Sequence, residues 1–181
     1  MNTLPLAVRS KIDEYLMGIK LTIVNPRKTA LGMWRFRAGQ HEITINSDLT
    51  GIQFMLTTVH EIAHARTWNL YKNTVKPHGQ EWKDQYRLLM LPLLQGYFGL
   101  DIDNILKKHM KNPPASARCT EELKRLLKPG TKLVSDVPLG CSFKLESGKE
   151  FVKLRKRRVK WECSNPEGKL FLVPGTMVAI F

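Results

Sequence analysis

The spacing of apolar and polar positions changes several times along the first half of the chain, and each change predicts an element. Apolar side chains recur every three to four positions over Leu4–Lys20, which predicts a helix. Short apolar or alternating runs follow over Leu21–Val24, Leu31–Phe36 and Glu42–Asn46, with turn signals between them. We therefore expect one helix followed by a small sheet of three strands.

A longer helical pattern returns over Gly51–Leu70, with Thr50 as the expected N-cap. A second helix is predicted to begin at Pro77, since proline suits a first helical position, and to end or kink at Pro92. Residues 93–110 have the pattern of a helix-turn-helix. The first 110 residues thus combine several helices with a few strands, which indicates an α+β fold.

The pattern changes again beyond residue 110. Residues 111–117 contain two prolines and small side chains, as in a linker, and a short helix is predicted over Thr120–Leu127. Short apolar runs then alternate with turn signals. The five strands they predict are Cys141–Leu145, Phe151–Leu154, Val159–Cys163, Leu170–Val173 and Met177–Ile180. We expect three parts: a mixed domain over 1–110, a linker with a short helix over 111–130, and a small all-β module resembling a barrel over 131–181.

Composition limits the class of protein. Hydrophobic residues make up 43% of the 181 residues, enough for a packed core. No apolar run approaches the roughly 20 residues of a membrane span, and the N-terminus lacks the pattern of a signal peptide. The three cysteines, Cys119, Cys141 and Cys163, are far apart and odd in number. This favours a reducing compartment, so we expect a cytoplasmic protein without a membrane partner.

The formal net charge of +13 lies mainly in the second half of the chain. Residues 107–181 contain 17 Lys+Arg and 7 Asp+Glu, a net charge of +10. Such asymmetry indicates an anionic partner, with nucleic acid first, and a nucleoid-associated or nuclear location if that partner is DNA. The alternative is a solvated surface that binds nothing.

The candidate chemistry lies in the longer helix, in the sequence His60-Glu61-Ile62-Ala63-His64. Residues four apart lie on the same helical face, so His60 and His64 can bind one zinc ion. Glu61 can then act as general base toward a water activated by the zinc. The alternatives are two histidines without a metal, or a structural zinc.

A catalytic zinc site usually has three protein ligands, so a third must come from elsewhere. The extended H-E-x-x-H-x-x-G-x-x-H pattern is absent, because Thr67 and Leu70 stand at its glycine and last histidine. We expect His78 as the third ligand of one zinc per chain, with Glu81 as its competitor. His41 and His109 are expected to be ordinary surface histidines.

The stretch VHEIAHARTWNLYKNTVKPHGQEW resembles the SprT-like zinc metallopeptidases, a family that includes the DNA–protein crosslink protease Spartan. The residues that carry the resemblance are His60, Glu61, His64, His78, Gly79 and Trp82. The resemblance implies a zincin-like domain over 1–110, in which helices pack on a small antiparallel sheet, one catalytic zinc, and proteolysis linked to DNA. The four-cysteine zinc ribbon of many bacterial members is absent, and the basic β module stands in its place.

The sequence therefore predicts a zinc-dependent endopeptidase that acts on DNA-associated proteins with Glu61 as general base. Residues 41–46 are the candidate for an edge strand that pairs with the main chain of a peptide substrate. The alternative function is a nucleic-acid-binding or regulatory protein whose zinc is structural.

A basic run in the C-terminal module is the candidate nucleic-acid site. Its residues are Arg155, Lys156, Arg157, Arg158 and Lys160. Around Arg158, Lys160 and Glu162, polar residues alternate with Val159, Trp161 and Cys163, which predicts a strand with a basic outer face and a buried inner face. Phosphate contacts made by such a face would not depend on base sequence and would weaken with salt.

Overall fold

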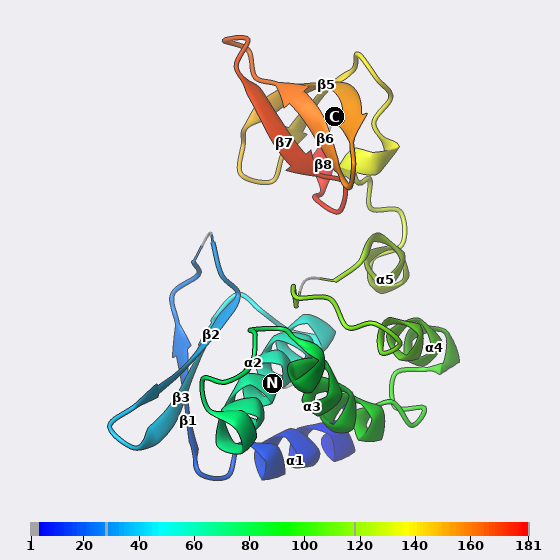
Figure 1. Cartoon of the computed structure of the whole chain (residues 1–181). Coiled ribbons are helices and arrows are strands. Elements are labelled where there is room, and N and C mark those ends of the chain that lie inside the picture. The colour runs from blue at the N-terminus through cyan, green and yellow to red at the C-terminus, as the bar shows by residue number, and fades with distance from the viewer. Residues whose placement is uncertain (1–3, 28, 118, 181) are drawn as a thin grey trace. The chain divides into compact units, whose positions relative to one another are not determined.

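The computed structural model describes residues 4–27, 29–117 and 119–180. The chain forms two compact units, 1–118 and 119–181 (Figure 1). Their boundary lies inside the stretch 111–130 that was expected to connect two domains. Among the described residues, no helix is both long and apolar enough to cross a membrane.

The N-terminal unit combines helices with a three-stranded sheet. Its elements are α1 (Leu6–Tyr15), β1 (Ile19–Val24), β2 (Gly32–Arg37), β3 (Gln40–Asn46), α2 (Gly51–Tyr71), α3 (Gln80–Met90), η1 (Leu91–Leu93) and α4 (Leu100–His109). The sheet has the order β1-β3-β2, with β1 and β3 parallel and β2 and β3 antiparallel. The expectation of an antiparallel sheet is wrong because β3 returns between β1 and β2, after two reversals of the chain.

The strand predicted as the edge of this sheet is its centre. β3 contains residues 41–46, and both of its neighbours pair with it. Its side chains Ile43 and Ile45 are fully buried, as in the central strand of a sheet covered by a helix. The expectation that residues 41–46 form a free edge is therefore wrong, and β2 is the edge strand next to α2.

Helix boundaries differ from the sequence pattern where glycines intervene. α1 ends at Tyr15 because Gly18 adopts a φ of +76° and β1 begins at Ile19. Residues 94–99 are irregular, and the predicted helix-turn-helix reduces to η1 and α4. Gly96 and Gly99 both have positive φ there, and the main-chain N–H of Gly96 donates to Asp103.

The C-terminal unit is a small antiparallel sheet with two short helices. Its elements are α5 (Glu121–Leu127), η2 (Val134–Asp136), β4 (Ser142–Leu145), β5 (Glu150–Arg157), β6 (Lys160–Ser164), β7 (Leu170–Pro174) and β8 (Ala179–Ile180). Strands pair in the order β7-β6-β5-β4-β8. The overall content is thus α+β, with a small mixed sheet and a separate five-stranded antiparallel sheet.

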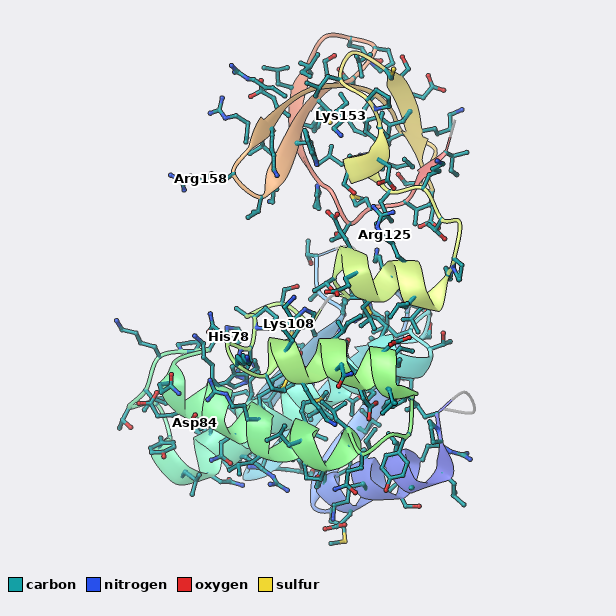
Figure 2. All side chains as sticks on the ribbon, turned by 90° about the vertical axis from the view of Figure 1, so that its right-hand side faces the viewer. His78, Asp84, Lys108, Arg125, Lys153 and Arg158 are labelled. Carbon is teal, nitrogen blue, oxygen red and sulfur yellow. The ribbon has the colours of Figure 1, made fainter. Side chains whose placement is uncertain are left out.

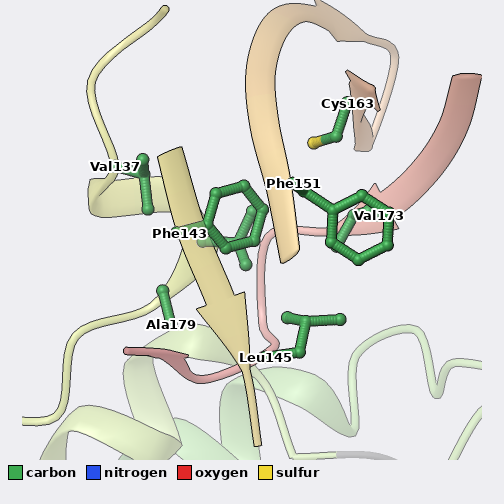
Figure 3. Packing of buried hydrophobic residues seen from close by; sticks show 8 residues of the cluster. Val137, Phe143, Leu145, Phe151, Cys163, Val173 and Ala179 are labelled. Atoms are coloured by element: carbon green, nitrogen blue, oxygen red, sulfur yellow. The ribbon is translucent and has the colours of Figure 1, made fainter. Parts of the chain in front are cut away.

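One apolar cluster fills the inside of this second sheet (Figure 3). Its residues are Val134, Val137, Phe143, Leu145, Phe151, Cys163, Val173 and Ala179. Trp161 and Phe171 pack against the cluster from the side. The alternation predicted for Trp161 and Cys163 therefore matches an inward-facing row on β6.

The basic run is not one strand. β5 ends at Arg157 and β6 begins at Lys160, so two residues turn the chain between them. Arg158 has a φ of +52°, and Val159 is 86% exposed instead of buried. The predicted strand Val159–Cys163 is thus found as β6, and only the expectation that Val159 points inward is wrong, because Val159 lies in the turn between the two strands.

Candidate metal centre

α2 presents the first two histidines and the carboxylate. Apolar and small side chains cover most of this 21-residue helix, and it is largely buried against the sheet and α3. His60 and Glu61 are buried, and His64, one turn further, is half-buried. The four-residue spacing puts His60 and His64 on the same side of the helix, as predicted.

His78 reaches these histidines from a turn. α3 begins only at Gln80, so the expectation that His78 stands on the second helix is wrong. His78 has a φ of +58°, and the main-chain N–H of Gly79 donates to the carbonyl of Lys76 at 2.9 Å. A Cβ on Gly79 would lie 2.9 Å from that carbonyl, so the tight turn requires glycine.

The three imidazoles converge on one point. The Nε2 atoms of His60 and His64 lie 3.3 Å apart, and each lies 3.0 Å from Nε2 of His78. In a tetrahedral zinc site with Zn–N distances of roughly 2.0–2.1 Å, ligand nitrogens are separated by about 3.3–3.4 Å. A single proton cannot satisfy three mutually adjacent nitrogens, whereas one cation can. The three side chains thus fit a metal ion, and zinc matches an all-imidazole set.

The competitor Glu81 is not among the described groups that gather at this point, which are His60, His64 and His78. It lies in the first turn of α3, with its Oε2 3.0 Å from the position of a Cβ on Gly79. The geometry therefore favours His78 over Glu81 as the third ligand.

Burial and mutual repulsion keep the histidines neutral. Burial is the main cause that lowers the pKa of His60 to about 3 and that of His64 to about 4, and neighbouring imidazoles add to both shifts. Burial also lowers the pKa of His78. Neutral imidazole is the form that binds a metal, so the cluster is ready to bind one at neutral pH.

Glu61 lies between the metal cluster and β2. Burial raises its pKa to about 7, against the opposing effect of a hydrogen bond from the main chain of Trp34. β2 can approach this closely only because residue 32 is glycine. A Cβ on Gly32 would lie 2.8 Å from Glu61 Oε1 and 2.8 Å from the Thr57 methyl group. An ionisable carboxylate with a pKa near neutrality is suited to accept and return a proton.

A cleft of about 430 Å³ opens in front of these groups. Its floor includes His60, Glu61, His64 and His78, and its sides come from β2 and from residues 72–77. Trp82, fully buried, forms the rear wall, with its ring centre 4.6 Å from that of His60 and stacked on Tyr86. The three histidines and Glu61 thus line one cleft.

His41 contacts Trp34, one of the residues that line this cleft. The indole N–H of Trp34 donates to His41 Nδ1 at 3.1 Å, and His41 Nε2 lies 2.7 Å from Asn69 Oδ1. Trp34 in turn stacks on His64, with planes 16° apart. His41 is half-buried and is not part of the three-histidine cluster, so the expectation that it takes no part in the metal site stays a prediction. Its contact with Trp34 depends on pairing across β2 and β3, which puts Phe36 opposite His41.

The basic residues lie on the β5–β6 hairpin of the other unit. Arg155 and Arg157 are paired with Glu162, at 2.8 and 3.3 Å. The Lys156 ammonium lies 5.6 Å from the centre of the Trp161 ring. Arg158 projects from the hairpin tip (Figure 2), and Lys160 begins β6 with an exposed side chain. Thus part of the predicted patch is engaged with an internal carboxylate.

Comparison with known proteins identifies the domain. The model of the SprT-like family matches residues 9–93, a stretch that holds all three clustered histidines and Glu61. This confirms the resemblance to the SprT-like family over residues 9–93. Searches of curated proteins and of solved structures found no match.

Proposed function

We propose that the chain is a zinc-dependent endopeptidase with a zincin-like catalytic domain. The observation that carries the proposal is the convergence of three Nε2 atoms within 3.0–3.3 Å, next to a buried carboxylate in an open cleft. A structural site would be closed by a fourth protein ligand. Among the described residues, the cluster has three.

The roles of the residues follow from this geometry. His60, His64 and His78 would hold the metal through Nε2. When bound, zinc supplies a Lewis acid that polarises the scissile carbonyl and activates water. Glu61 accepts the proton of the attacking water and delivers it to the departing amine nitrogen. Trp34 fixes this carboxylate through its main-chain N–H, so Glu61 is already oriented before substrate binds.

The free edge of β2 is the place for the substrate main chain. Gly32, Met33 and Trp34 line the cleft, and β2 has a pairing partner only on its β3 side within the sheet. An extended peptide added to that edge would pass in front of Glu61. This assigns to β2 the role that the sequence suggested for residues 41–46.

The test is metal content and cleavage measured on the same samples. Wild type should contain one zinc per chain and cleave casein or histones. Glu61→Gln should keep its zinc and lose activity by roughly 10²–10⁴-fold, the usual contribution of a general base. Matched Glu14→Gln, on the exposed surface of α1, should behave as wild type. Undiminished cleavage by Glu61→Gln would contradict the mechanism.

Nucleic-acid binding is a second function, favoured by the exposed cations of the β5–β6 hairpin. Such binding would direct the protease to DNA-associated proteins. If zinc is present but no cleavage occurs with or without single-stranded DNA, the chain is instead a binding or regulatory protein with a structural zinc. Neutralising Arg155, Lys156, Arg157 and Arg158 together should weaken DNA binding, and unchanged affinity would exclude this site.

A further inference from the structure

We propose that Trp34 and Trp68 form a substrate subsite that takes an aromatic side chain close to the scissile bond. The inference rests on the proposed endopeptidase function and names a preference of that same site. It follows from the course of β2 past the metal centre, from the way the two indoles are held, and from which of their atoms face the cleft.

β2 passes the metal centre with alternate side chains directed toward α2. A Cβ on Gly32 would contact Glu61. Two residues further, the Trp34 ring stacks on that of His64, with centres 6.0 Å apart and planes 16° apart. A strand advances about 3.3 Å per residue, so an extended peptide paired with the free edge of β2 would carry a side chain past Trp34 within two residues of Glu61.

Trp34 is held in place by its neighbours. Its indole N–H donates to His41 Nδ1 at 3.1 Å, and His41 Nε2 lies 2.7 Å from Asn69 Oδ1. Its ring stacks on His64, and its centre lies 5.7 Å from that of Trp68. The indole cannot turn without losing these contacts. It therefore offers a preorganised surface, and a ligand that binds to it loses little free energy in ordering it.

The two indoles offer carbon atoms to the cleft and keep their polar atoms away from it. Trp68 lines the cleft and is half-buried, yet its indole N–H is buried. The N–H of Trp34 is already donated to His41. The two rings are tilted by 53° to each other, so together they make an apolar corner. Such a corner favours another aromatic ring, which can stack on one indole and meet the other edge-on.

The cleft can hold a ring beside the catalytic groups. Its volume of about 430 Å³ is well above the roughly 150 Å³ of a cavity that binds benzene. Lys72, one turn beyond Trp68, and Lys76 also line the cleft, and both are exposed. An acidic side chain is therefore the competing ligand. Ion pairs at exposed positions contribute little, so we expect the indoles to decide the preference.

The first experiment measures side-chain preference in the full-length, zinc-loaded chain. Peptides with glycine, aspartate, leucine or phenylalanine at each of the two positions on either side of the cleaved bond are tested on wild type, Trp68→Ala and Tyr71→Ala. Tyr71 is an exposed aromatic residue of α2 that is not among the described residues lining the cleft, so its variant is the matched control.

In wild type, kcat/KM should be about 10-fold or more higher for phenylalanine than for glycine at one position. Trp68→Ala should lose most of this ratio, and Tyr71→Ala should keep it. Equal rates for phenylalanine and glycine in wild type would overturn the proposal. So would a preference for aspartate at that position, or a ratio that Trp68→Ala leaves unchanged.

The second experiment needs no catalysis and remains informative if Trp68→Ala fails to fold. Zinc-loaded Glu61→Gln is titrated with fluorescently labelled peptides of the same set. The phenylalanine peptide should bind about 10-fold or more tightly than the glycine peptide. Adding Trp68→Phe, whose smaller ring fits the same space, should reduce this difference while zinc content stays the same.

The outcomes separate the subsite from the proposed function. Equal affinity for the two peptides, no binding of either, or a difference that Trp68→Phe leaves unchanged would overturn the subsite. Tighter binding of the phenylalanine peptide that depends on Trp68, without any cleavage by wild type, would instead reject the proposed function and keep the subsite.

Discussion

The two units bury ionisable side chains in opposite ways. In the N-terminal unit, His60 and Glu61 are only 6% and 7% exposed, and their nearest polar neighbours include other titratable groups of the same site. In the C-terminal unit, Lys153 is 2% exposed (Figure 2 shows its place), and its ammonium is fully engaged by groups of the protein. The first arrangement leaves imidazole nitrogens facing one another, as in a metal site, and the second is satisfied by groups of the protein.

The hydrogen bonds make the difference explicit. Lys153 Nζ donates to the carbonyls of Ser135 at 3.0 Å and Val137 at 2.6 Å, and lies 3.5 Å from the centre of the Trp161 ring. His60 Nδ1, by contrast, is buried and finds no partner in the described part of the chain, and its Nε2 faces two other imidazoles. Ser135 Oγ of the C-terminal unit is also buried without a hydrogen-bond partner among the described residues, so the feature that distinguishes the candidate metal centre is the convergence of three imidazoles and not a single unpaired atom.

The largest expected effect is on metal binding, and it separates His78 from Glu81. His78→Ala removes one of the three ligand nitrogens. Loss of a residue that only hydrogen-bonds to a ligand typically lowers metal affinity roughly 10–100-fold, so the loss of a ligand itself should lower zinc affinity by more. Glu81→Ala should change zinc affinity little, because its carboxylate is not among the three converging groups. Competition with a chromophoric chelator measures both. A larger loss for Glu81→Ala would reverse the assignment of the third ligand.

Lys153→Met tests whether the buried ammonium is structural. The substitution leaves two buried carbonyls without a donor and removes the contact with Trp161, so unfolding free energy should drop by about 1–3 kcal/mol. Lys149→Met, at an exposed position, is the control. Urea unfolding measures the loss, and zinc content should not change. If Lys153→Met has the same unfolding free energy as Lys149→Met, an apolar side chain at residue 153 stabilises the unit as well as the ammonium does.

The cations of the β5–β6 hairpin fall into two groups: Arg155 and Arg157 form ion pairs with Glu162, whereas Lys156, Arg158 and Lys160 do not pair with it. Neutralising Lys156, Arg158 and Lys160 should lower the salt dependence of DNA binding by roughly 0.7–0.9 per lost phosphate contact. Neutralising Arg155 and Arg157 should lower it less, because Glu162 already engages both. Affinities measured by fluorescence anisotropy at several salt concentrations test this. Equal slopes for the two variants would show that the ion pairs do not limit phosphate contact.

The smallest expected effect concerns Asp136 in the C-terminal unit. The Arg125 guanidinium binds both of its oxygens, at 2.5 and 3.1 Å, and holds the pKa of the Asp136 carboxyl below its usual value. A lowered folded-state pKa stabilises the fold above the unfolded pKa near 4, and this contribution is lost as pH falls through the folded value. Asp136→Asn should flatten the acid limb of the stability curve and cost less than Lys153→Met. An unchanged acid limb would mean that other carboxylates dominate it.

Much of the secondary structure could be predicted because it follows local patterns. The helix over Gly51–Leu70 is found as α2, and the five predicted C-terminal strands correspond to β4 through β8. Failures occurred where the chain turns. The alternation that begins at Val159 does not show that Val159 itself lies in a turn, and the glycines near 96 and 99 break a pattern that is otherwise helical.

The spacing of His60 and His64, with Glu61 between them, specified a metal-binding helix face, because an α-helix repeats every 3.6 residues whatever surrounds it. The order of strands, which made β2 the free edge, was decided only by long-range pairing. The same holds for the left-handed turn that brings His78 to α2, for the hydrogen bond from Trp34 to His41, and for the position of residues 115–117 beside Glu61. None of these follows from the repeat of a single helix or strand, so only the packing of several elements decides it.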